Sequence, residues 1–139
     1  MKRFLSIIFL VIFSISLASC SRISNPTPES CYNFRCEVTD EDKVFIIEGD
    51  DAKSIYSECN KNMQNATLSS DAIGTGEYIK IKFIGDKRPE PKKSSDTVLF
   101  STLTIHTNDV VLYEGKLTYN YQFKSGFFQM IDLLILLKK

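Results

Sequence analysis

Cysteine is the residue type with the best-defined chemistry in this sequence, because a thiol can form a disulfide, bind a metal or carry an acyl chain. Three of the four cysteines are Cys31, Cys36 and Cys59. If Tyr32–Val38 is an extended strand, alternation places Cys36 on the apolar face and Cys31 on the opposite face. If residues 51–63 form a helix, Cys59 lies on its apolar stripe. The two inward-facing thiols predict a disulfide between Cys36 and Cys59 with Cys31 free. Pairing of Cys31 with Cys59 is the alternative.

Other chemistry-bearing residues are few. The single histidine, His106, ends a predicted strand, and we expect it to be a solvated surface residue. Three cysteines and one distant histidine lack the paired spacing of a zinc module. The acidic clusters at residues 40–42 and 50–51 lack the ligand spacing of a calcium loop. The sequence does not exclude a Ser–His–Asp catalytic triad, although it has no G-x-S-x-G element. We therefore expect no catalytic residue, no metal and no cofactor, and the chain is predicted not to be an enzyme.

A basic, proline-containing segment at residues 85–96 is the one remaining functional candidate. It carries four cations within seven residues: Lys87, Arg88, Lys92 and Lys93. One interpretation is a solvated connection between two strands. The other is a contact for anionic envelope material, such as phosphorylated lipid head groups or an acidic partner.

The first twenty residues have the organisation of an export signal. Lys2 and Arg3 precede a nearly unbroken apolar run, Phe4–Leu17, and small residues then lead to Cys20. A basic start, an apolar centre and a small-residue cleavage site define a secretory signal peptide. The run is shorter than the about 20 residues of a membrane span, so we expect cleavage rather than an uncleaved anchor.

The sequence Leu17-Ala18-Ser19-Cys20 resembles the lipobox of bacterial lipoprotein precursors. The resemblance implies removal of residues 1–19 and acylation of Cys20, and two or more acyl chains give stable membrane attachment. In that family an aspartate after the cysteine holds the protein at the inner membrane. Here the position is Ser21, so the resemblance implies attachment to the outer membrane, facing the periplasm.

The sequence after the signal predicts one small domain on a tether. Residues 20–30 are polar, with two prolines, and read as the lipidated cysteine and a flexible tether. Residues 31–139 are long enough for a single domain. Loss of Lys2 and Arg3 leaves 15 basic and 17 acidic side chains, a formal charge of −2. This balance, together with export, argues against nucleic-acid binding.

Hydrophobic periodicity predicts an α+β fold, with a mainly antiparallel sheet, one helix after the second strand and a C-terminal helix. Lys43–Glu48 has an unbroken apolar centre and is predicted to be a strand covered on both faces. An aspartate at residue 50 or 51 is expected to cap the first helix. Phe127–Leu137 is predicted to be a helix buried against the sheet. A final buried strand, or a segment lying on the membrane or a partner, are the alternatives. Further strands are expected at Tyr78–Ile84, Val98–His106, Val110–Tyr113 and residues 117–123.

These observations predict a membrane-anchored bacterial envelope lipoprotein whose domain is a non-enzymatic binding or assembly component. Its expected contacts are the membrane, through acylated Cys20, and an envelope protein or an anionic envelope component. The alternative is a periplasmic inhibitor or immunity-type lipoprotein that blocks a hydrolase or toxin. A small enzyme is the least favoured of the three.

Overall fold

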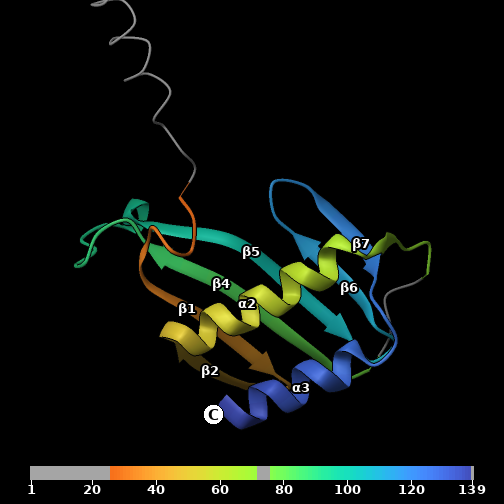
Figure 1. The fold of residues 1–139 in the computed structure, drawn as a ribbon. Coiled ribbons are helices and arrows are strands. Elements are labelled where there is room, and N and C mark those ends of the chain that lie inside the picture. Colours follow the sequence, from red (N-terminus) through yellow and green to blue (C-terminus); the bar gives the residue numbers. More distant parts are fainter. Residues whose placement is uncertain (1–25, 72–75, 139) are drawn as a thin grey trace, which may run out of the picture.

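A computed structural model describes residues 26–71 and 76–138 (Figure 1). The segment that resembles a lipobox and the proposed lipid-attachment residue Cys20 lie outside the described residues. The described chain forms one seven-stranded antiparallel sheet in the order β2-β1-β4-β5-β6-β7-β3. The strands are β1 (Tyr32–Asp40), β2 (Lys43–Glu48), β3 (Thr67–Leu68), β4 (Tyr78–Asp86), β5 (Thr97–His106), β6 (Val110–Glu114) and β7 (Thr118–Gln122).

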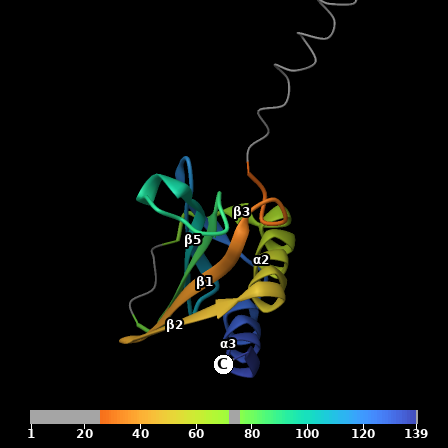
Figure 2. The same cartoon turned by 90° about the vertical axis from the view of Figure 1, so that its left-hand side faces the viewer.

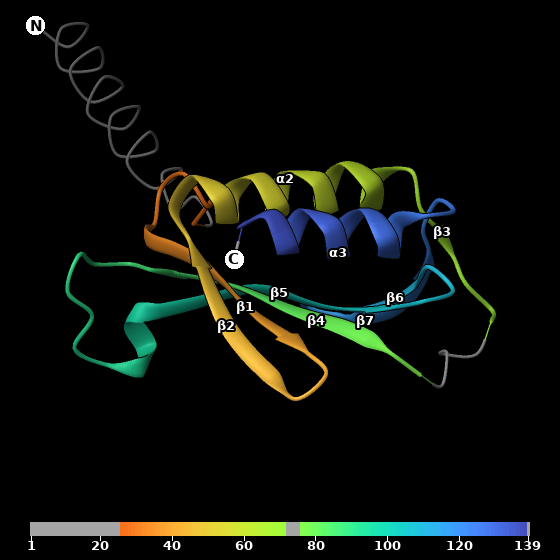
Figure 3. The same ribbon diagram turned by 90° about the horizontal axis from the view of Figure 1, so that it is seen from below.

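Two α-helices, α2 (Gly49–Gln64) and α3 (Phe127–Lys138), lie side by side on one face of the sheet (Figure 3). One short 3-10 helix, η1 (Ser94–Asp96), precedes β5. The predicted α+β fold is confirmed, with one helix after the second strand and one at the C-terminal end. No helix in the described ranges combines the length and the apolar character needed to cross a bilayer.

The first helix follows directly from β2. Gly49 has φ +62°, a left-handed conformation that glycine adopts without steric cost, and this allows the chain to turn from strand to helix. Asp50 and Asp51 lie in the first turn, where a negative charge is favourable near the helix N-terminus. The expected aspartate cap is wrong, because Glu48 occupies the N-cap position and its side chain makes no capping hydrogen bond.

The C-terminal helix is docked on the sheet, as predicted. Its inner stripe consists of Phe127, Ile131 and Ile135, all fully or almost fully buried. Asp109, in the turn between β5 and β6, caps the helix start. Its carboxylate accepts hydrogen bonds from the backbone N–H groups of Gly126 (3.0 Å) and Phe128 (2.8 Å). A contact between distant segments therefore determines where α3 begins.

A β-bulge near the start of β1 changes which side chains face the core. Tyr32 is opposite Asp86 and Arg35 is opposite Ile84, so one extra residue is inserted in β1 between these pairs. Asn33, within the bulge, has φ +49°. The expectation that Cys31 lies on the face opposite the core is wrong, and so is the inward position that the same alternation gives to Tyr32. The insertion reverses the alternation, so that Tyr32 is exposed and Cys31 packs against the core.

Strand β2 is at an edge of the sheet. The prediction that both its faces are covered is wrong, since Val44 and Ile46 are 66% and 55% exposed on the face without helices. Strand β3, at the other edge, was not predicted because its two residues are too few to show periodicity.

Candidate functional site

Three segments that are distant in the sequence lie together at one end of the domain, the end at which the described chain begins. They are residues 26–31, the β4–β5 connection at 87–96 and the β6–β7 turn at 115–117. Figures 1 and 2 show all three at the same end, and the C-terminal end of α3 at the opposite end. We call this end the tether end.

The described part of the tether is a turn that belongs to the domain. The backbone N–H groups of Ser30 and Cys31 donate to the carbonyl of Thr27 at 3.0 and 3.1 Å. Pro28, within the turn, is buried. Residues 27–31 therefore form part of the described domain, and residues 21–25 are what remains of the predicted tether after Cys20.

The four predicted cations, Lys87, Arg88, Lys92 and Lys93, are all exposed on the β4–β5 connection, which we call the basic loop. Its shape is held by the buried residue Asp96. One carboxylate oxygen of Asp96 accepts from the backbone N–H groups of Lys92 (3.1 Å) and Lys93 (3.2 Å). The other oxygen lies 3.6 Å from Arg88 Nε. The loop therefore presents its side chains from a fixed backbone.

These interactions lower the pKa of Asp96. The backbone hydrogen bond from Lys92 is the largest favourable contribution, followed by that from Lys93 and by the charges of Arg88 and Lys87. A carboxylate that accepts backbone N–H bonds is favoured over its protonated form. The loop geometry is consequently coupled to the charge of one buried side chain.

We expect Asp96→Ala to loosen the basic loop without unfolding the domain, so that amide exchange at Lys92 and Lys93 becomes faster. Asp96→Asn removes the charge at constant size and serves as the control. Because the native pKa lies below the unfolded value of about 3.9, the stabilisation is present above that pH. It is lost as the pH falls through the native pKa. Hydrogen exchange measured by NMR tests this, and unchanged rates in Asp96→Ala would contradict it.

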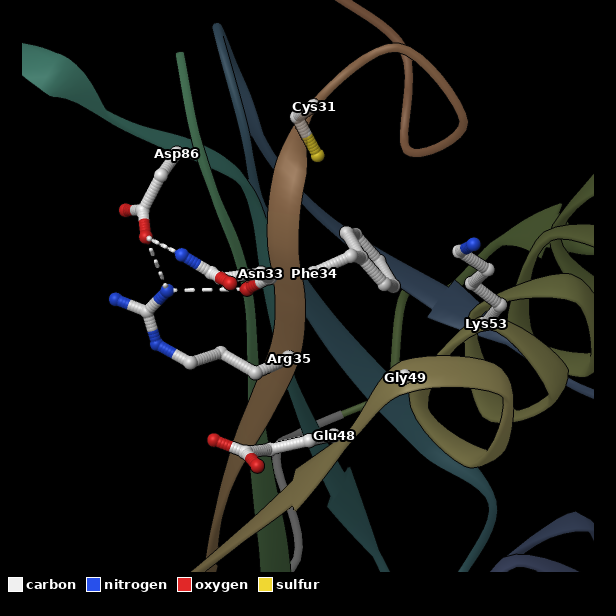
Figure 4. A pocket seen from close by; sticks show the side chains of 8 residues that line it. All are labelled: Cys31, Asn33, Phe34, Arg35, Glu48, Gly49, Lys53 and Asp86. Carbon is white, nitrogen blue, oxygen red and sulfur yellow. Dashed lines mark hydrogen bonds and ion pairs between the residues drawn. The ribbon is translucent and has the colours of Figure 1, made fainter. Parts of the chain in front are cut away.

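A second buried carboxylate belongs to Asp86, the last residue of β4 before the basic loop, and it connects this position to the β1 bulge. Its Oδ2 atom accepts from Asn33 Nδ2 at 3.1 Å and pairs with Arg35 Nη1 at 3.3 Å. Asn33 Nδ2 also donates to the carbonyl of Pro89 in the basic loop. The bulge is what turns Asn33 toward Asp86 while Arg35 reaches the same carboxylate, as Figure 4 shows.

A cleft of about 560 Å³ lies beside this cluster, where β1 extends past the end of β2 (Figure 4). Cys31, Lys53 and Glu48 line it together with the Asp86 cluster. The Cys31 thiol donates to the carbonyl of Pro28 at 3.2 Å, and burial raises its pKa. A raised pKa makes the thiol a weak nucleophile at neutral pH. Cys31 also packs so closely on Gly85 that a Cβ there would overlap its sulfur.

The inward-facing cysteines lie away from this cleft, in the core. Cys36 on β1 and Cys59 on α2 are both buried, as predicted, and both belong to the same core cluster. Burial raises the pKa of Cys36 to about 12 and raises that of Cys59 as well. Cys31, Cys36 and Cys59 are free thiols in this structure, so the disulfide between Cys36 and Cys59 stays a prediction.

His106 is not the solvated residue that the sequence suggested. It is buried, and its ring centroid lies 6.0 Å from that of Tyr78, the residue opposite it on β4. Its position at the end of β5 therefore does not leave the imidazole in solvent, and alternation within one strand could not show this. Among the residues described, no group of three or more His, Cys, Asp or Glu side chains is placed to hold a metal ion.

Sequence reasoning found the basic loop but missed the residues that shape it. Asp86, Asp96 and Asn33 were not singled out, because nothing in their local sequence shows that they meet. Comparisons of the chain with protein-family models, with curated proteins and with solved structures find no match.

Proposed function

We propose that this chain is a bacterial envelope lipoprotein, anchored to the outer membrane through acylated Cys20 and facing the periplasm. Its domain acts as a non-enzymatic binding or assembly component. The Leu17–Cys20 lipobox and the preceding basic and apolar segments support the anchor. The absence of catalytic motifs from the sequence supports the non-enzymatic role.

The single observation that carries the proposal is the position of the basic loop. A chain acylated at Cys20 enters the domain at Pro26, and the loop with Lys87, Arg88, Lys92 and Lys93 lies at that same end (Figure 1). Positive charge beside the point of attachment suits an anionic component of the envelope. Hydrogen bonds to Asp96 also fix the backbone of the loop, as expected of a binding surface rather than of a flexible connection between strands.

Cys20→Ala tests the anchor. We expect the parent protein to have an N-terminus at Cys20 with acyl mass added, because the thiol is the attachment point. The variant is expected to remain an unprocessed precursor or to leave the membrane fraction. Intact-mass analysis of both proteins decides the question. A mature parent protein without acyl mass at Cys20 would contradict the proposal.

A pull-down of the lipidated protein from membranes tests the role of the domain. A complex of several envelope components supports binding or assembly. Recovery of one folded hydrolase or toxin would instead favour the inhibitor or immunity-type alternative.

A further inference from the structure

We propose that the tether end of the domain rests on an anionic bilayer surface. Leu99 and Leu117 enter the headgroup region, and the lysines of the basic loop contact lipid phosphates. This inference rests on the proposed anchor, because attachment at Cys20 is what brings the domain to the membrane.

The length of the tether limits how far the domain can move from the membrane. Five residues, 21–25, separate Cys20 from Pro26, where the described domain begins. An extended chain of this length spans about 20 Å at most. The anchor therefore keeps the tether end within a short distance of the lipid headgroups, while the opposite end of the domain faces away.

The tether end carries apolar side chains that no other described segment covers. Leu99 and Leu117 are 58% and 63% exposed. Strand β5 extends past the point where β6 begins to pair with it, at Thr102 and Glu114. The start of β5 pairs with β4 but not with β6. It borders a groove of about 390 Å³, which is lined by Val98, Leu99 and Phe100 and by residues of the β6–β7 turn and Pro26.

Exposed cations lie at the same end of the domain as these leucines. Lys116 lines the groove beside Leu117, and the basic loop contributes Lys87, Lys92 and Lys93. None of these four ammonium groups forms an ion pair with another residue in the described ranges.

The tether end also carries acidic side chains. Asp86 and Asp96 are buried and paired with arginines, Glu114 is half-buried, and Glu29, Glu90 and, in the cleft beside Asp86, Glu48 are exposed. Exposed leucines and exposed lysines at the end nearest the proposed anchor match an anionic bilayer, which offers an apolar boundary beneath phosphates.

Tryptophan substitution tests the contact directly, because the chain contains no tryptophan. Leu117→Trp places a fluorophore at the tether end. Leu137→Trp places one at the far end of α3, where Leu137 is 73% exposed. Each variant is prepared as the acylated protein reconstituted in vesicles. Each is also prepared as the unacylated chain from residue 20, with Cys20→Ser, mixed with vesicles. The described core lies within residues 31–135, so the unacylated chain keeps all of it.

With phosphatidylcholine vesicles that contain phosphatidylglycerol, we expect the emission of Leu117→Trp to shift to shorter wavelength and that of Leu137→Trp to stay unchanged. Lys92→Ala combined with Lys93→Ala is expected to weaken vesicle binding of the unacylated chain by roughly thirtyfold, at about fivefold per lysine near an anionic surface. Lys43→Ala combined with Lys124→Ala removes equal charge at the opposite end and should leave binding unchanged.

The proposal is overturned if the emission of Leu117→Trp in acylated protein does not shift, or if the emission of both variants shifts equally. The basic loop would then be expected to bind an acidic protein instead of lipid. Binding that does not depend on phosphatidylglycerol would also overturn the proposal. The two proposals are tested separately. Absence of acyl mass at Cys20 contradicts the lipid anchor, whereas vesicle binding by the unacylated chain measures only the contact between the tether end and the bilayer.

Discussion

A chain that ends at Ser125 is expected to be unfolded, whereas the full chain unfolds in one cooperative transition. The truncation removes α3 and with it Phe127, Ile131 and Ile135, which are 0%, 0% and 3% exposed. Burial of one such side chain contributes roughly 1.5–3 kcal/mol, so the three together contribute roughly 5–9 kcal/mol. A whole domain is stable by only about 5–15 kcal/mol.

The truncation would also open the remaining core. Phe123 packs against Phe127 with ring centroids 4.5 Å apart and the rings tilted, and Asp109 would lose the backbone N–H groups that it caps. A buried carboxylate without partners is costly, which adds to the loss of apolar contacts. Thermal unfolding of the two chains measures the effect. Nearly equal midpoints would show that α3 is a contact surface rather than part of the core.

Single substitutions on opposite faces of α3 give a matched comparison. Ile131→Ala is expected to lower the free energy of unfolding by roughly 2–5 kcal/mol, because it leaves a cavity among packed side chains. Leu137→Ala, at an exposed position on the same helix, is expected to change it by less than about 0.5 kcal/mol. Similar losses in both variants would mean that something covers the outer face of α3.

Oxidised protein is expected to contain one disulfide, between Cys36 and Cys59, and to be more stable than the reduced protein by about 3 kcal/mol. The bond would close a loop of about two dozen residues, and the estimate follows from the entropy that such a loop removes from the unfolded chain. Both thiols lie in the same core cluster, Cys36 on β1 and Cys59 on α2.

Burial determines when this bond can form. Because the pKa of Cys36 is raised to about 12 and that of Cys59 is also raised, neither thiol is ionised appreciably at neutral pH in the folded state. Thiol–disulfide exchange requires a thiolate and access to it. We therefore expect oxidation during folding, before α2 covers β1, and slow oxidation of protein that has folded in reduced form.

Non-reducing peptide mapping identifies the pairing, and denaturant unfolding with and without reductant gives its energy. Cys59→Ala is the control, and its stability should not depend on reductant. The bulge at Asn33 turns Cys31 toward the helix-covered face, so a Cys31–Cys59 link is the competing result. That link would show that Cys31 reaches α2 and that Cys36 only packs in the core.

The sequence alone determined the long helices and strands of this protein and the side chains that carry its charge, but not the two-residue strand β3. Alternation along Tyr78–Ile84 and Val98–His106 predicted β4 and β5, and the apolar run from Phe127 predicted α3. The basic loop was also predicted, because four cations between two strands need no tertiary information to be recognised. These features depend on side chains a few residues apart, which is the range that periodicity samples.

The tertiary structure decided which surfaces those elements expose and how the tether end is built. The bulge at Asn33 exchanged the faces of Cys31 and Tyr32, and the edge position of β2 left Val44 and Ile46 exposed.

Asp86 and Asp96 hold the tether end together through hydrogen bonds and ion pairs. They can do so only because β1, β4 and the basic loop meet there. Each of these outcomes depends on a partner that is distant in the sequence. The pattern of neighbouring residues indicates which side chains of a strand could be buried. The order and register of the strands in the sheet determine which of them are buried.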